Sequence, residues 1–217
     1  MSFIDTLSQA DGLSRAVTWL LLCMSVASWV IILYKSWLLQ SAVKDLAVCK
    51  GLFWQATDWS QAHAQWLQAD RQAMFLPLLQ AINFMPGNGL ASQPMLQDQL
   101  TRYLREALQA VRARLQWGQD VLATVGATAP FVGLLGTVWG IFHALTNLSG
   151  AGQYTLDKVA QPVGEALVMT AAGLAVAIPA VMAYNLMGRR LARLDAELEG
   201  LAYDLRALAP SLSVKQG

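Results

Sequence analysis

The sequence predicts an all-α integral membrane protein with three transmembrane helices and long cytoplasmic helical extensions. Three observations support this fold class. The 217 residues are 55% hydrophobic and only 13% charged, whereas roughly a quarter of the residues in soluble domains carry a charge. Three apolar stretches are long enough to cross a bilayer. The remaining segments place their apolar residues at helical spacing, which is typical of amphipathic helices.

The first predicted transmembrane helix covers residues 16–34 and follows a short polar segment at residues 1–15. Its 19 residues carry no charge and come close to the roughly 20 that an α-helix needs to span a bilayer. Trp19 lies near one end, and Tyr34 and Trp37 lie near the other. Because aromatic side chains are enriched at both membrane interfaces, this stretch has the ends of a span as well as its length.

Residues 35–120 predict a cytoplasmic helical region, with charged side chains scattered among apolar ones. Pro86, followed by Gly87 and Gly89, marks a turn within it. Beyond this turn the apolar residues recur at helical steps and predict one apolar helix face: Leu96, Leu100, Tyr103, Ala107, Val111 and Leu115. We expect this helix to run without a break into the second transmembrane helix at residues 121–148.

A short polar link at residues 149–158 joins the second span to the third, which covers residues 159–187. A cytoplasmic C-terminal helix and tail follow at residues 188–217. Leucines in this helix alternate in steps of three and four, a pattern typical of helix packing in water: Leu191, Leu194, Leu198, Leu201, Leu205 and Leu208. The stripe fits packing against the chain's own helix at 95–118 and packing between subunits equally well.

The positively charged residues predict the orientation in the membrane. Residues 35–120 contain eight Lys or Arg residues and residues 188–217 contain five, whereas residues 1–15 and the link at 149–158 contain one each. Lys and Arg prefer the cytoplasmic side of a membrane. We therefore expect the N-terminus and the link on the periplasmic side and the C-terminus in the cytoplasm.

Small residues follow one face of the second span, again at steps of three and four: Gly126, Ala129, Gly133, Gly136 and Gly140. The third span is also rich in small residues, among them Gly173. Small side chains let helix backbones approach closely in a membrane, so these positions predict tight helix packing. Packing of the second span on the third within one chain explains part of this pattern, and packing between subunits is the other source.

Glu165 is an acidic residue within the third span, where a lone carboxyl group is energetically costly. Such a group usually faces a protein interior or a water-filled path, although near a helix end it can instead reach the lipid headgroups. Low dielectric disfavours the charged carboxylate, so a carboxyl group in this position can take up and release a proton. The residue therefore predicts proton movement better than permanent cation binding.

Thr137 and Thr170 lie at a similar depth to Glu165. A hydroxyl group both donates and accepts hydrogen bonds, so these side chains can order water or relay protons beside the carboxyl group. Bonding to a carbonyl of their own helix is the alternative. Glu165 and Thr170 are five residues apart and point roughly 140° apart around a straight helix. Both approach one pore only through a bend in the helix or through the geometry of an oligomer.

Three spans with one such ionisable group do not enclose a channel, whereas a ring of subunits can, each contributing Glu165. The sequence has no phosphate-binding loop, nucleophile triad or dinucleotide-binding loop. It therefore predicts neither an enzyme, nor a metal or cofactor site, nor nucleic-acid binding. Cys23 and Cys49 are expected to be small buried hydrophobic side chains and not a disulfide.

Two long motifs give the chain a family resemblance. Residues 129–141 read Ala-Pro-Phe-Val-Gly-Leu-Leu-Gly-Thr-Val-Trp-Gly-Ile, and residues 162–180 read Pro-Val-Gly-Glu-Ala-Leu-Val-Met-Thr-Ala-Ala-Gly-Leu-Ala-Val-Ala-Ile-Pro-Ala. Together they closely resemble the ExbB/TolQ/MotA proton-channel family. The resemblance covers residues 117–195 strongly and the rest by topology. It is strongest to the ExbB branch, with the TolQ branch as the close alternative.

The resemblance implies a homopentamer in the bacterial inner membrane that surrounds the single transmembrane helices of two ExbD-like partners. It also implies that Glu165, Thr137 and Thr170 line the proton pathway. A TonB-like protein would carry the resulting work to outer-membrane receptors for iron–siderophores, vitamin B12 or similar cargo. A TolQ-like subunit of the Tol-Pal envelope system remains open, and a non-conducting structural membrane scaffold is the alternative from another functional class.

Overall fold

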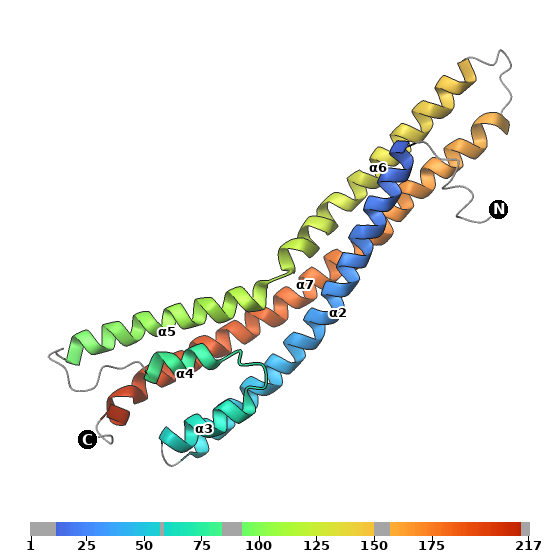
Figure 1. Ribbon diagram of the computed structural model, residues 1–217. Coiled ribbons are helices and arrows are strands. Elements are labelled where there is room, and N and C mark those ends of the chain that lie inside the picture. The colour runs from blue at the N-terminus through green and yellow to red at the C-terminus, as the bar shows by residue number, and fades with distance from the viewer. Residues whose placement is uncertain (1–11, 57–58, 84–92, 150–156, 214–217) are drawn as a thin grey trace. The chain divides into compact units, whose positions relative to one another are not determined.

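The computed structural model describes residues 12–56, 59–83, 93–149 and 157–213 (Figure 1). These residues form six helices and no strand: α2 (Gly12–Gln55), α3 (Trp59–Ala69), α4 (Leu76–Asn83), α5 (Gln93–Gln116), α6 (Gln119–Ser149) and α7 (Asp157–Ser213). Three helical stretches, within Gly12–Gln55, Asp98–Thr146 and Ala160–Ala207, are long and apolar enough to cross a membrane. The all-α fold class with three membrane-length helices is therefore confirmed. The expected turn at 85–89 lies outside the described residues, as does most of the 149–158 link.

The chain divides into two compact units. Unit 1 comprises Met1–Tyr34 and Gly118–Leu186, and unit 2 comprises Lys35–Trp117 and Met187–Gly217. Helices α2 and α7 each contribute residues to both units. The predicted ends of the first and third spans fall within one residue of these divisions, but each lies inside a continuous helix. In both α2 and α7, the side chains therefore change from mainly apolar to partly charged within one continuous helix.

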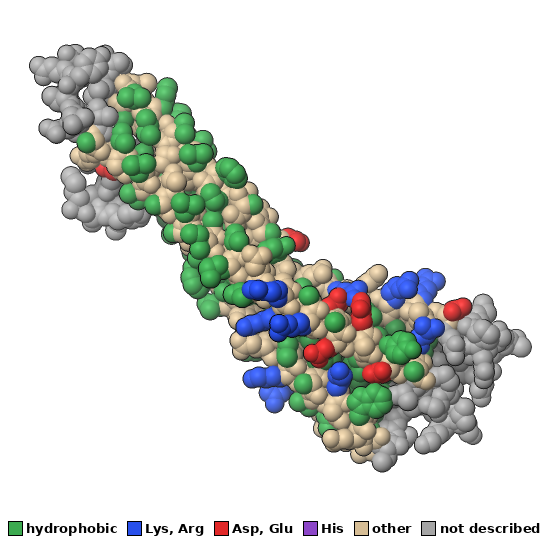
Figure 2. All heavy atoms as spheres, turned by 180° about the vertical axis from the view of Figure 1, so that it is seen from behind, with side chains coloured by type: hydrophobic (Ala, Val, Ile, Leu, Met, Phe, Trp, Pro, Cys, Tyr) green, Lys and Arg blue, Asp and Glu red, His purple; other side chains and the backbone are tan. Residues whose placement is uncertain are grey.

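Unit 1 contains the first part of α2, all of α6 and the first part of α7. Its buried side chains include Val17, Ala129 and Ala180, which are small or aliphatic. Large hydrophobic side chains point outward instead, and Phe131 and Val138 are 71% and 60% exposed. On the face in Figure 2, hydrophobic side chains cover this unit, whereas charged side chains gather mainly over unit 2. A small-residue core with an apolar exterior is suited to a lipid environment.

The core of unit 2 contains buried leucines of α2, α4, α5 and α7, and α4 packs on α5. Five leucines of the α7 stripe are buried within the single chain: Leu191, Leu194, Leu198, Leu201 and Leu205. The side chain of Leu208 lies outside the described residues. Since these five side chains are already covered, the stripe packs within the chain.

The apolar face of α5 differs from the prediction at one position. Leu100, Ala107 and Val111 are buried as expected, and so is Leu115. Tyr103, in contrast, is 36% exposed, and its neighbour Leu104 is 3% exposed. Leucine at position 104 keeps a four-residue step from Leu100, so the buried face follows the helical period without Tyr103. The side chain of Leu96 lies outside the described residues.

The predicted unbroken helix leading into the second span is wrong. Helix α5 ends at Gln116, and α6 begins at Gln119. Gly118 between them has a φ of 83°, a left-handed conformation that favours glycine because a Cβ atom would be strained there. A Cβ atom at Gly118 would also lie 3.1 Å from Ile31 Cγ2. The turn therefore depends on a glycine that the apolar pattern alone does not single out.

Lys35 caps the end of α5. Its Nζ atom donates a 2.5 Å hydrogen bond to the carbonyl oxygen of Trp117, and its side chain is fully buried. The last carbonyl groups of a helix have no partner within the helix, and a cation is favourable at this end of the helix dipole. In the sequence, Lys35 is only the first charged residue after an apolar stretch, so its contact with Trp117 could not be predicted from the sequence.

The connection between α3 and α4 is organised by Asp70, which is 6% exposed. Its Oδ1 atom accepts a 2.9 Å hydrogen bond from the Met74 amide, and Oδ2 accepts a 2.7 Å bond from the Phe75 amide.

Cys49 is fully buried in unit 2, and burial raises the pKa of its thiol to about 12. Cys49 therefore fits the expected buried side chain, whereas Cys23 is exposed and does not; both are free thiols.

Candidate functional site

Glu165 lies in the N-terminal part of α7 and is exposed. Gln161, one helical turn earlier, donates a 3.2 Å hydrogen bond from Nε2 to Glu165 Oε1. The next residue, Ala166, is 4% exposed and lies against Gly140 of α6. Neighbouring positions point about 100° apart around a helix, so Glu165 is directed away from this contact. In a bilayer, its carboxyl group therefore requires water, a headgroup or another protein.

Thr137 and Thr170 lie in contact between α6 and α7. Thr170 Oγ1 donates a 3.3 Å hydrogen bond to Thr137 Oγ1. Thr137, which is 5% exposed, donates in turn to the carbonyl oxygen of Leu134, at 2.7 Å. A backbone carbonyl accepts a hydrogen bond and has no proton to pass on. In this arrangement the two hydroxyl groups link the helices, and proton relay requires the Thr137 hydroxyl to rotate.

Of the three candidate proton-pathway residues, Thr137 and Thr170 form a hydrogen-bonded pair, and Glu165 lies apart from them. Thr170 faces α6, whereas Glu165 is on an exposed side of α7. This arrangement agrees with the five-residue separation, which turns the two side chains roughly 140° apart. Within one chain the structure brings Thr137 and Thr170 together and leaves Glu165 apart from them.

The backbones of α6 and α7 lie close together at Gly133 and Gly173. Their Cα region leaves no room for side chains, because a Cβ atom on Gly133 would lie 2.7 Å from the Met169 carbonyl oxygen. A Cβ atom on Gly173 would lie 2.6 Å from the carbonyl oxygen of Ala129, which is itself fully buried. The obstructing atoms belong to the backbone, so neither helix can yield by rotating a side chain. Both glycines therefore set the helix spacing directly.

The other glycines of the stripe also face neighbours within the chain. A Cβ atom on Gly140 would lie 3.0 Å from Ala166 Cβ, and one on Gly126 would lie 2.5 Å from a Val181 methyl group. Gly136 is close to Met169. The stripe is therefore explained by packing of the second span on the third, which holds Thr137 against Thr170.

Helix α2 completes unit 1 by packing on the same two helices. Val17 Cγ1 would lie 3.1 Å from a Cβ atom on Gly136. Thr18 Oγ1 donates a 2.8 Å hydrogen bond to the carbonyl oxygen of Ser14 and lies 3.6 Å from Met169 Sδ. The sequence predicted that the first part of α2 spans the membrane. It did not predict which residues of α2 contact α6 and α7, because nothing in the apolar stretch distinguishes them.

The described residues contain no group of three or more His, Cys, Asp or Glu side chains that could hold a metal ion. Among the described side chains, Glu165 is an acidic residue of unit 1 that lies within an apolar stretch of α7.

Comparison with known proteins assigns the chain to a family. Residues 73–200 match the family described as the MotA/TolQ/ExbB proton channel family, a range that includes α5, α6 and all three candidate proton-pathway residues. The "Biopolymer transport protein ExbB" of Neisseria gonorrhoeae is 49% identical over 116 residues. That match covers 54% of this chain, and the chain spans about half, 53%, of the length of the Neisseria protein.

Two further relatives match over most of their length. The "Biopolymer transport protein ExbB" of Xanthomonas campestris pv. campestris is 38% identical over 206 residues, covering 88% of this chain and 80% of the relative. The "Tol-Pal system protein TolQ" of Haemophilus influenzae is 32% identical over 203 residues, covering 91% and 89%. With three membrane-length helices, these matches support a multi-pass inner-membrane protein. The chain belongs to the MotA/TolQ/ExbB proton channel family.

Proposed function

We propose that this chain is an ExbB-like proton-channel subunit of a complex that uses the proton motive force to energise transport across the outer membrane. The observation that carries the proposal is the position of Glu165, an exposed carboxyl group on a membrane-length helix of a proton-channel family member. Because its own chain leaves this group uncovered, a pathway around it needs other subunits. A ring of subunits is therefore part of the proposal, and five copies follow the family resemblance.

Each residue has a defined role in this proposal. Glu165 takes a proton from the outer side, which forms an O–H bond on the carboxyl group, and that bond breaks when the proton is released toward the cytoplasm. Thr137 and Thr170 meet in the contact between α6 and α7, and they orient water or pass the proton on after the Thr137 hydroxyl leaves the Leu134 carbonyl. The glycine contacts keep α6 and α7 close enough for the two hydroxyl groups to meet.

The partners are proposed from the same family. ExbD-like proteins with one transmembrane helix would occupy the ring, and a TonB-like protein would transmit the work to outer-membrane receptors for iron–siderophores, vitamin B12 or similar cargo. The orientation places the N-terminus in the periplasm and the C-terminus in the cytoplasm, as the distribution of Lys and Arg favours. In this orientation the leucine-rich part of α7 is cytoplasmic.

The ExbB-like function is favoured over the TolQ-like one by similarity. The Xanthomonas relative is 38% identical and the Haemophilus TolQ relative 32%, over alignments of nearly equal length. A TolQ-like role in the Tol-Pal system remains the second candidate, since both matches cover most of this chain.

Iron–siderophore uptake that depends on a TonB-like protein tests the proposal. Cells lacking the native subunit receive this chain with its single-span partner, either unchanged or as Glu165→Gln or Glu165→Ala, at matched membrane levels. We expect the unchanged chain to restore uptake and both variants to fail. Glu197→Gln, which removes an exposed carboxylate from the same helix within unit 2, is the matched control and retains uptake.

The remaining outcomes separate the alternatives. Full uptake in both Glu165 variants removes Glu165 from the proposal. Restoration of outer-membrane integrity in a strain lacking TolQ, without siderophore uptake, assigns the chain to the Tol-Pal system. Normal assembly and partner binding without any proton-driven activity would support the structural scaffold.

A further inference from the structure

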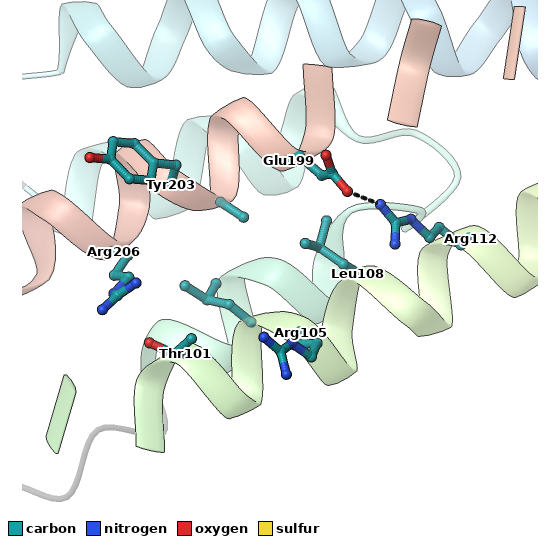
Figure 3. A pocket seen from close by; sticks show the side chains of 9 residues that line it. Thr101, Arg105, Leu108, Arg112, Glu199, Tyr203 and Arg206 are labelled. Carbon is teal, nitrogen blue, oxygen red and sulfur yellow. Dashed lines mark hydrogen bonds and ion pairs between the residues drawn. The ribbon is translucent and has the colours of Figure 1, made fainter. Parts of the chain in front are cut away.

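A groove of about 240 Å³ lies between α5 and α7 in unit 2 (Figure 3). Nine residues line it: Thr101, Leu104, Arg105, Leu108, Arg112, Glu199, Ala202, Tyr203 and Arg206. Its volume is below the roughly 300–1,000 Å³ of pockets that enclose small molecules. The space fits one or two side chains of a docked segment better than a complete small-molecule ligand.

The charges in the groove are unevenly matched. At one end, Arg112 donates from Nε to Asp195 and from Nη2 to Glu199, so two carboxylates surround this guanidinium. Arg105 of α5 and Arg206 of α7 are both exposed and form no ion pair with any described residue. The groove therefore presents two guanidinium groups from different helices without matching negative charge.

The rest of the lining is apolar or aromatic. Leu104 and Ala202 are 3% and 6% exposed, so the groove lies over part of the α5–α7 core. Tyr203, a residue of the lining, is 71% exposed. Tyrosine and arginine are enriched among the residues that dominate binding energy at protein interfaces. An apolar surface flanked by Tyr203 and two unmatched arginines is suited to a polypeptide, since a free anion would leave the apolar surface exposed.

The two unmatched arginines of the groove lie outside the predicted spans. Arg105 lies 12 residues before Trp117, the last residue of its segment of unit 2, and Arg206 lies 20 residues after Leu186, the last residue of unit 1. They therefore belong to the segments 35–120 and 188–217 that are expected in the cytoplasm, where a partner polypeptide has access to them.

We propose that this groove docks an acidic segment of a partner polypeptide on the cytoplasmic side. Two carboxylates of the segment pair with Arg105 and Arg206, for which the planar guanidinium offers paired N–H donors. An apolar side chain between them covers Leu108 and packs beside Tyr203. The proposal concerns an interaction surface in unit 2 and does not depend on proton conduction through unit 1.

Peptide binding to the full chain in nanodiscs of uncharged lipid tests the proposal. The probe is a fluorescently labelled peptide that repeats Glu-Asp-Leu-Glu-Asp, and its control repeats Gln-Asn-Leu-Gln-Asn. At low ionic strength, where exposed charges are screened least, we expect the acidic peptide to bind and the neutral peptide not to bind. The double variant Arg105→Gln with Arg206→Gln should weaken binding about tenfold or more, because two charge-assisted contacts are lost.

A charge-matched control separates the groove from the general charge of the protein. The double variant Arg190→Gln with Arg193→Gln removes two exposed arginines of α7 that do not line the groove. It should leave peptide affinity unchanged. Equal weakening by both double variants, or no binding by the unchanged chain, overturns the proposal. The proposal is also overturned if inorganic phosphate, added at the same total negative charge as the peptide, displaces the peptide. Loss of the oligomer in the groove variant with peptide affinity unchanged would assign the surface to a second copy of the chain instead.

Discussion

At the scale of single residues, two buried polar side chains organise unit 2. Lys35 binds the Trp117 carbonyl at the end of α5, and Asp70 binds two amides before α4. In each case a charged group meets backbone groups that no regular helix hydrogen bond satisfies. The sequence shows both residues as ordinary charges among apolar neighbours, because the contact partners are set by tertiary structure.

Asp70 gives a prediction at this scale. In Asp70→Ala, the amides of Met74 and Phe75 lose their acceptors while they remain buried. Each unsatisfied buried donor costs about 1–3 kcal/mol. Because two amides lose their acceptor, we expect at least that loss in the free energy of unfolding of the detergent-solubilised protein. Asp98→Ala changes an exposed carboxylate in α5 and serves as the control. Equal stability of the two variants would contradict this account of the loop.

Glu165 is a candidate from the sequence because a lone carboxyl group in an apolar span has few explanations, and its role stays a prediction. Its separation from Thr170 also followed from helix geometry. The Thr137–Thr170 contact did not follow from spacing, since it depends on how α6 and α7 pack.

At the scale of helices, the packing of α6 on α7 depends on glycines whose substitution would place a Cβ atom against backbone. The small-residue stripe predicted close packing, and the structure adds the partner atoms, such as the Met169 carbonyl opposite Gly133. The length of the apolar stretches indicated the three membrane-length helices, and apolar periodicity indicated α5 and the C-terminal part of α7. It did not locate the end of α5, where the backbone of Gly118 turns into a left-handed conformation.

Gly133→Ala and Gly173→Ala test this packing. Each added methyl group would lie 2.6–2.7 Å from a backbone oxygen of the facing helix, and overpacking typically costs about 1–3 kcal/mol. We expect both variants to unfold at lower temperature in detergent, as measured by tryptophan fluorescence. Gly164→Ala, where nothing lies within 4 Å of the added atom, is the matched control and should lose no stability. A loss as large in the control would show that helix spacing is not the cause.

At the scale of the whole molecule, the single chain leaves a large apolar exterior on unit 1 and leaves the carboxyl group of Glu165 exposed. An apolar exterior is compatible with lipid, but an exposed carboxyl group at membrane depth is compatible with it only at a cost. This contrast is the physical reason for proposing a ring in which Glu165 faces other protein chains or water. The number of subunits is not encoded in any periodicity of one chain, so five copies stay a proposal based on the family resemblance.

Proton flux into liposomes tests the central claim most directly. The complex of this chain with its single-span partner is reconstituted, a potential is applied, and a pH-sensitive dye inside the liposomes reports proton entry. We expect flux with the unchanged chain and with Glu197→Gln, and loss of flux with Glu165→Gln in complexes of unchanged subunit composition. Undiminished flux in Glu165→Gln would contradict the claim that this carboxyl group carries the proton.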